Sequence, residues 1–271
     1  PNVRRWLSSL RPGQLSPFLL SAPPIWAREV SKRRAHCRLS RRGCRSINSK
    51  NTGVLMAFLS RSLANHVLTL TMSSPETRNA LTGAEQFDDI VQVCQEINDN
   101  MSIRAVVLTG EGTAFCAGGN VKDMRDRTGM FAGDPMDQAE AYRKGIQRIP
   151  RAIYSLYVPI IAAVNGPAFG AGCDLATMCD IRVASTKAML AESFAKLGLI
   201  PGDGGAWFLP RVVGYSNACL MAIAGEPVKA EAAMQMGLVS EVVEPEALGE
   251  RAQTRTAGMD ATPTQEVRWT K

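Results

Sequence analysis

Two glycine-rich segments are the parts of the sequence best suited to chemistry. The segment "GEGTAFCAGGNVKDM" spans residues 110–124 and "NGPAFGAGCDLATMCD" spans 165–180; each follows an apolar run typical of a buried strand. Glycine lets a backbone approach a ligand without a Cβ in the way. Backbone N–H groups from two such loops, one at a helix N-terminus, could form an oxyanion hole for a thioester or ester carbonyl.

Other ligands and nucleophiles fit the sequence less well. The dinucleotide pattern G-x-G-x-x-G fails because Leu175 occupies the third glycine position, and the Walker lysine pattern does not occur. The chain has only two histidines, His36 and His66, and its seven cysteines show no C-x-x-C spacing. A zinc site and a histidine-activated nucleophile are therefore disfavoured, and a reducing compartment is expected.

Three acidic residues behind the glycine loops could transfer protons, and each also has a structural interpretation. Asp174 could cap the helix that it begins, and Glu192 could be a surface acid that faces Lys196 at i, i+4. Asp203 could be a turn residue among glycines. Because a helix N-terminus favours negative charge, Asp174 is expected to be ionised at neutral pH unless burial raises its pKa.

The spacing of apolar residues predicts an α/β fold that would position these groups. Strands are predicted within 66–72, 103–110, 158–166 and 181–191, and helices over 84–100, 136–156, 171–180 and 216–225. Alternation of strands and helices, with glycines where the strands end, places a functional site in the loops beyond the strand ends.

Charge is unevenly distributed over the 271 residues. Residues 1–55 contain twelve Lys and Arg against one acid, whereas the remaining residues contain 19 basic and 24 acidic side chains, a net charge of −5. We expect this basic N-terminal extension to be disordered or non-native; a mitochondrial transit peptide and a nucleic-acid-binding arm are the alternatives. No run of 18 apolar residues occurs, so we expect no membrane span.

Five motifs in one order make residues 67–243 resemble the enoyl-CoA hydratase/isomerase (crotonase) superfamily. The resemblance implies a spiral of ββα units, assembly as a homotrimer or dimer of trimers, and an acyl-CoA substrate with no other cofactor and no metal. The motifs are "SSPETRNAL", "AVVLTGEGTAFCAGGNVKDM", "PIIAAVNGPAFGAGCDLATMCDIRVAS", "FAKLGLIPGDGGAWFLPRVVG" and "GLVSEVVEP".

The resemblance also assigns roles to individual residues. The N–H groups of Gly119 and Ala171 would form the oxyanion hole; the family usually has glycine at the second position, and alanine is tolerable there if its backbone is helical. We expect the substrate to contact Glu76, Thr77, Arg78, Ala117, Asn120, Val121, Gly170 and Phe194. The family often has Asp where this chain has Asn120, a change expected to affect the bonding of the loop.

The acid positions of the family are only partly kept. Hydratases that this chain resembles use two glutamates; the first matches Asp174, which is one methylene shorter, and the second matches Phe194. Some isomerases of the superfamily carry an acid one residue after the proline of "GLIP", where this chain has Gly202. Glu192 and Asp203 lie nearby, so we include both with Asp174 as catalytic candidates.

These observations predict an enoyl-CoA hydratase that adds water to a 2-enoyl-CoA. The alternatives are a double-bond or ring isomerase that uses a single carboxylate, and a non-catalytic acyl-CoA-binding or RNA-binding relative. We expect a crotonase-like core over 56–243 and a truncated C-terminal helical region over 244–271, because 253–271 carries Thr, Pro and Gly where helix formers are expected; this would weaken the trimer. The expected location is the cytoplasm, or the mitochondrial matrix if 1–55 is a transit peptide, and nucleic-acid binding is not expected.

Removal of residues 1–55 is predicted to leave folding and activity unchanged. This segment has no periodic apolar face that a core could bury. Expression of the chain from Met56 onward, compared with the full chain by soluble yield and acyl-CoA turnover, tests the prediction. Loss of most of the soluble protein would contradict it.

Overall fold

In a computed structural model of the chain, the structure describes residues 58–260. Contacts divide the chain into Pro1–Thr52 and Gly53–Lys271, and all described residues belong to the second unit. The predicted extension over 1–55 and the last residues, 261–271, lie outside the described residues.

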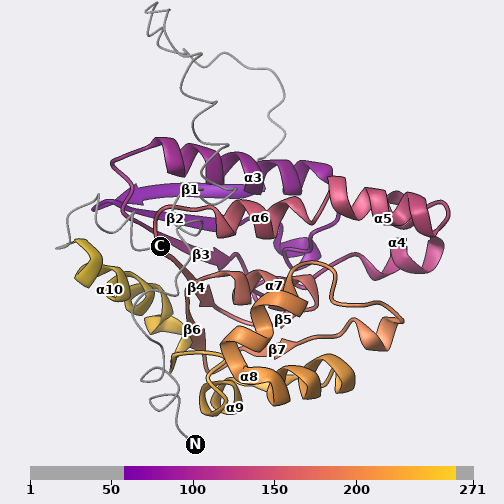
Figure 1. Cartoon of the computed structure of the whole chain (residues 1–271). Helices are drawn as coiled ribbons and strands as arrows, with labels where there is room; N and C mark the ends of the chain where they lie inside the picture. The colour runs from indigo at the N-terminus through magenta and orange to yellow at the C-terminus, as the bar shows by residue number, and fades with distance from the viewer. Residues whose placement is uncertain (1–57, 261–271) are drawn as a thin grey trace, which may run out of the picture. The chain divides into compact units, whose positions relative to one another are not determined.

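A six-stranded sheet is the centre of the described fold (Figure 1). Its strands run in the order β1-β2-β3-β4-β6-β9; β1 is antiparallel to β2 and the other neighbours are parallel. The strands are β1 (Leu59–Ala64), β2 (Val67–Met72), β3 (Ala105–Gly110), β4 (Ile160–Val164), β6 (Ile181–Ser185) and β9 (Glu241–Val243). A second, smaller sheet contains β5 (Ala168–Phe169), β7 (Met189–Ala191) and β8 (Val228–Lys229).

Helices follow pairs of strands, so ββα units recur as β1-β2-α3, β4-β5-α7 and β6-β7-α8. The helices are α3 (Ala84–Asp99), α4 (Val121–Asp126), α5 (Pro135–Lys144), α6 (Arg148–Tyr154), α7 (Ala171–Met178), α8 (Gly205–Ala224), α9 (Ala230–Gln235) and α10 (Leu248–Asp260). Short 3₁₀ turns are η2 (Pro75–Thr77), η3 (Gly129–Phe131), η4 (Ala195–Leu197) and η5 (Pro245–Ala247). The predicted α/β fold with repeated ββα units is confirmed.

The large sheet is covered on both faces, which explains why its central strands are apolar throughout. On β3, Val106 and Leu108 belong to the core that includes α3, α6 and α7, while Val107 faces the opposite side. There it belongs to a smaller cluster with Leu248 and Ala252 of α10. Figure 1 shows α10 and α6 on opposite sides of the sheet.

The structure corrects several predicted boundaries. The helix predicted over 136–156 is two helices, α5 and α6, and the one predicted over 216–225 is the second half of α8, which bends at Gly214. Strand β1 was not predicted because only Leu59 of its residues is buried. In the C-terminal region, α10 continues through the weak helix formers after Ala252 to Asp260.

Asn79 joins the turn after β2 to the loop after β3. Its side chain is completely buried; Oδ1 accepts a hydrogen bond from the Ser74 N–H at 3.0 Å. Its Nδ2 lies 2.9, 3.0 and 3.3 Å from the carbonyl oxygens of Glu111, Ala114 and Phe115. A buried amide that satisfies this many backbone groups fixes where the first glycine loop begins.

Asn79→Asp is predicted to destabilise the fold by about 3 kcal/mol, because a carboxylate would face the same three carbonyl oxygens without an N–H to donate. Asn98→Asp is the matched control, since the Nδ2 of that half-exposed residue donates to the Ser155 carbonyl at 2.9 Å. We expect it to cost less than about 1 kcal/mol. Urea unfolding of the two variants measures the difference, and equal losses would contradict this role of Asn79.

Candidate active site

Three segments assigned to substrate binding from the sequence lie side by side through backbone hydrogen bonds. Cys116 pairs with Ala168 in a parallel bridge, and the Phe169 N–H donates to the Cys116 carbonyl at 3.0 Å. On the other side of the same segment, the Ala117 N–H donates to the Arg78 carbonyl at 2.9 Å. The loop over 115–121 is therefore held between the turn at 76–81 and the loop at 167–171.

The two predicted oxyanion donors lie at this junction. In the described part of the chain, neither the Gly119 N–H nor the Ala171 N–H has a hydrogen-bond partner. A Cβ built on Gly118 would lie 2.4 Å from the Phe169 carbonyl oxygen and 3.3 Å from the Ala171 nitrogen, so the two loops touch where only glycine fits. Ala171 begins α7 with negative φ, and its methyl group is accommodated without backbone strain.

The other predicted substrate-binding residues surround this junction. Glu76, Thr77 and Arg78 are exposed on and after η2, and Val121 is exposed at the start of α4. The Asn120 side chain caps α4 by accepting a hydrogen bond from the Lys122 N–H at 3.0 Å, which is the loop role expected for it.

Phe194, the residue at the family's second acid position, is buried next to the second loop. A Cβ built on Gly170 would lie 3.7 Å from the tip of the Phe194 ring. An apolar ring therefore closes the space beside Gly170.

Three carboxyl groups are buried close together behind the loops. Asp174, Glu192 and Asp203 are 0%, 1% and 4% exposed and come from α7, from the residue after β7 and from the turn before α8. The interpretation of Glu192 as a surface acid is wrong. Lys196 instead pairs with Glu226, with Nζ and Oε1 2.8 Å apart.

The Asp174 carboxyl lies against the beginning of α8 and not at the end of its own helix. A Cβ built on Gly205 would lie 2.0 Å from Asp174 Oδ1, so only glycine leaves space for the carboxyl. Burial raises the pKa of Asp174 well above its usual range, and the negative charges of Glu192 and Asp203 raise it further. The backbone N–H of Gly205 opposes these effects only in part. Asp174 therefore meets the exception stated for it: burial raises its pKa, and the neutral form is favoured.

The other two carboxyl groups have raised pKa values for the same physical reason. Burial raises the pKa of Glu192, and the neighbouring Asp174 and Cys173 lower it in part. Burial, followed by the charge of Glu192, raises the pKa of Asp203 to about 7. A carboxyl that titrates near neutral pH next to one that stays protonated can serve as the base of an acid–base pair.

Asp203 lies in a turn among glycines, as its structural interpretation proposed, and residues from α5 and from the start of α6 contact this turn. Gln147 Nε2 donates to the Gly202 carbonyl at 3.0 Å. Burial, followed by the charge of Asp203, raises the pKa of Tyr142. Sequence reasoning missed Tyr142, Asn79 and Gly205, because their partners are far away in the sequence.

Several other residues near the site have structural roles. Cys116, Cys173 and Cys179 are buried free thiols that pack in the hydrophobic core. Trp207 is exposed, and the Arg211 guanidinium lies over its ring at 3.3 Å from the centroid. Among the described residues, no group of His, Cys, Asp and Glu could hold a metal ion.

Comparison with known proteins identifies the family of the chain. The sequence matches the family model described as "Enoyl-CoA hydratase/isomerase" over residues 62–271. The 1,2-epoxyphenylacetyl-CoA isomerase of Escherichia coli (strain K12) is 35% identical over 210 residues, covering 78% of this chain and 79% of that protein. The short-chain-enoyl-CoA hydratase of Clostridium acetobutylicum is 36% identical over 185 residues, 67% of each protein.

A solved structure gives the same result for the fold. The crystal structure of an enoyl-CoA hydratase from Mycobacterium smegmatis superposes with a TM-score of 0.71 at 33% identity, covering 78% of this chain and 79% of that one. The chain belongs to the enoyl-CoA hydratase/isomerase family, has the crotonase fold and is an enzyme of that family. In the residues that the structure describes, no helix is long and apolar enough to cross a membrane.

The raised pKa of Asp203 predicts a pH-dependent stability. Its folded-state pKa of about 7 exceeds the unfolded value of about 4, so between these values the folded protein binds more protons and its stability falls as pH rises. Compared with Asp203→Asn, the wild type should lose up to about 4 kcal/mol of unfolding free energy between about pH 4 and pH 8. Urea unfolding at each pH measures this difference. Parallel pH profiles for the two proteins would contradict the prediction.

Proposed function

We propose that this enzyme adds water reversibly to a 2-enoyl-CoA through a thioester enolate held in an oxyanion hole. The observation that supports this most directly is the pairing of two unpartnered backbone N–H groups with a cluster of buried carboxyl groups, of which Asp174 lies one helical turn after Ala171. Hydration needs both features, because charge develops on the thioester oxygen while protons move to and from carbon and water.

The N–H groups of Gly119 and Ala171 would donate to the thioester oxygen. Ala171 is the first residue of α7, so its N–H has no acceptor within the helix and the helix dipole favours negative charge there. The exposed residues Glu76–Arg78 and the half-buried Ala117 and Asn120 would contact the CoA portion, because their segments adjoin the Gly119 loop.

The carboxyl groups would divide the proton transfers according to their protonation. Asp174, which favours its neutral form, would donate a proton to the α-carbon. Asp203, with a pKa of about 7, would accept a proton from the attacking water. In this proposal the Asp203 carboxylate replaces the second glutamate that the family carries at the position of Phe194.

The proposal requires no cofactor beyond the CoA that the substrate carries. The described cysteines are free thiols, which supports a reducing compartment such as the cytoplasm. A homotrimer or dimer of trimers is proposed for the assembly, and nucleic acid is not proposed as a partner.

A second candidate is the isomerisation of an enoyl-CoA with a single carboxyl group. Two observations favour it: Phe194 occupies the second acid position, and the similar Escherichia coli protein is named 1,2-epoxyphenylacetyl-CoA isomerase. Two assays distinguish the reactions. Hydration of crotonyl-CoA is monitored by the loss of the enoyl thioester absorbance, and isomerisation by the conversion of a 3-enoyl-CoA to a 2-enoyl-CoA.

Asp174→Asn is predicted to lower turnover by about 10² to 10⁴ while acyl-CoA affinity changes little. The amide keeps the size of the side chain and cannot exchange a proton. Crotonyl-CoA hydration and the binding of a saturated acyl-CoA would be measured in parallel. Glu246→Gln, at an exposed carboxyl, is the control and should turn over like the wild type.

A purely structural Asp174 predicts a different result. The melting temperature would fall while turnover per folded molecule stayed nearly constant. That outcome, or wild-type turnover in the Asn variant, would remove Asp174 from the mechanism.

A further inference from the structure

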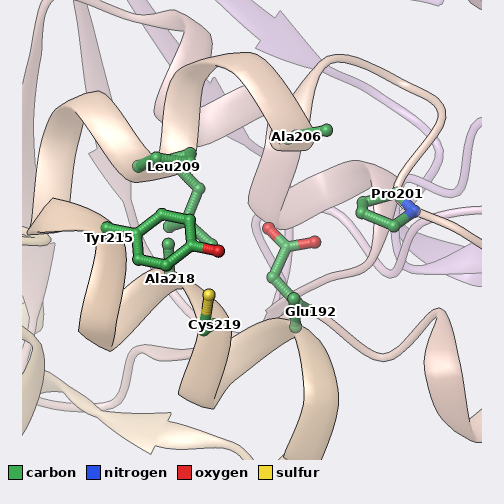
Figure 2. A pocket seen from close by; sticks show the side chains of 10 residues that line it. Glu192, Pro201, Ala206, Leu209, Tyr215, Ala218 and Cys219 are labelled. Atoms are coloured by element: carbon green, nitrogen blue, oxygen red, sulfur yellow. The ribbon is translucent and has the colours of Figure 1, made fainter.

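A small pocket lies beside α8, on its side toward Glu192 (Figure 2). Its volume is about 180 Å³, and both halves of the bent helix line it, with Leu209 from the first half and Tyr215 and Cys219 from the second. Among the described residues that line it, Glu192 is the one carboxyl group. The proposed hydration mechanism assigns no role to this pocket.

The Glu192 side chain points into this pocket, and its polar neighbours are the Asp174 carboxyl and the Cys173 thiol. Figure 2 shows its carboxyl directed from the end of β7 toward α8, with Pro201 on one side. The residue is 1% exposed, and among the described residues neither Oε1 nor Oε2 has a hydrogen bond of ordinary length and angle. Burial of a carboxyl without a well-formed hydrogen bond is unfavourable, so an exchangeable proton or a water in the pocket would offset that cost.

The same pocket borders Asp174. Gly205 lines the pocket, and it is the residue whose missing side chain leaves room for the Asp174 carboxyl. Asp174 and Glu192 are also close enough for each to change the pKa of the other. Cys173 and Asp203 are the other titratable neighbours of this pair. Glu192 therefore lies between the pocket and Asp174, and the two carboxyl groups form a possible path for a proton.

The proposed hydration requires a path by which Asp174 regains a proton. Asp174 ends each turnover as a carboxylate, having given its proton to the α-carbon, while Asp203 ends it protonated. Asp174 has no exposed surface, and an acyl-CoA bound at the glycine loops would cover the substrate side. Before the next turnover Asp174 must regain a proton through the protein.

We propose that Glu192 returns a proton to Asp174 after each turnover and takes its own from water in the pocket beside α8. In the first step the Glu192 O–H bond breaks and an O–H bond forms on the Asp174 carboxylate. In the second, the Glu192 carboxylate takes a proton from a hydronium ion in the pocket, leaving water. Asp203 releases its proton to solvent, so the cycle is balanced. Glu192 acts through Asp174 and does not touch the substrate; the inference rests on the proposed hydration.

Rapid-mixing kinetics with crotonyl-CoA separate this role from a structural one. Glu192→Gln keeps the shape of the side chain but cannot pass a proton on. We expect its first turnover to match the wild type and its later turnovers to be at least about tenfold slower, giving a burst of about one product per site. Small carboxylic acid buffers should raise the rate of the later turnovers toward that of the wild type, because they can deliver a proton to Asp174 directly.

Two further variants keep the test decisive. Ala222→Leu would fill the pocket from the second half of α8 without altering Glu192, and we expect the same burst; it carries the test if Glu192→Gln does not fold by circular dichroism. Cys219→Ala changes the same lining without filling it and should show no burst.

The results have clear meanings. A first turnover slowed as much as the later ones, or steady-state rates equal to the wild type, would overturn the relay while leaving the proposed function intact. Absence of wild-type turnover on crotonyl-CoA, or full activity of Asp174→Asn, would overturn the proposed function and the relay together.

Discussion

The backbone contact between the two glycine loops is the constraint on which the rest of the site depends. Cys116 pairs with Ala168, and Gly118 approaches Phe169 so closely that a Cβ would lie 2.4 Å from its carbonyl oxygen. This contact brings the N–H groups of Gly119 and Ala171 to one place from strands β3 and β4, which are neighbours in the sheet. Any side chain at position 118 would separate the two donors that the proposed chemistry requires.

The carboxyl cluster depends on a second close approach, between α7 and α8. Gly205 gives the Asp174 carboxyl its space, and burial then favours the neutral form of that carboxyl. Because Asp174 lies one turn after Ala171 on α7, the contact between the two loops also positions the Asp174 carboxyl, the proposed proton donor. Asp203 and Glu192 extend this cluster toward α5 and toward the pocket beside α8.

The sequence was sufficient to predict features set by local patterns. The apolar runs of β3 and β4 and the glycines after them predicted the buried strands and the loops. The sequence was insufficient where the environment of a side chain depends on residues far away in the chain. The spacing of Glu192 and Lys196 suggested a surface pair, but Lys196 bonds Glu226 and Glu192 is buried. Likewise α10 forms through Thr254 and Thr256 because Leu248 and Ala252 pack on the sheet, which overrides weak helix propensity.

A crystal structure with a non-reactive acyl-CoA analogue tests the central claim most directly, because it shows which groups face the thioester. The account predicts the thioester oxygen within about 2.7 to 3.1 Å of the Gly119 and Ala171 nitrogens, with the Asp174 carboxyl facing the α-carbon. A thioester oxygen bound away from these two N–H groups, or an Asp174 carboxyl turned away from the acyl chain, would contradict it.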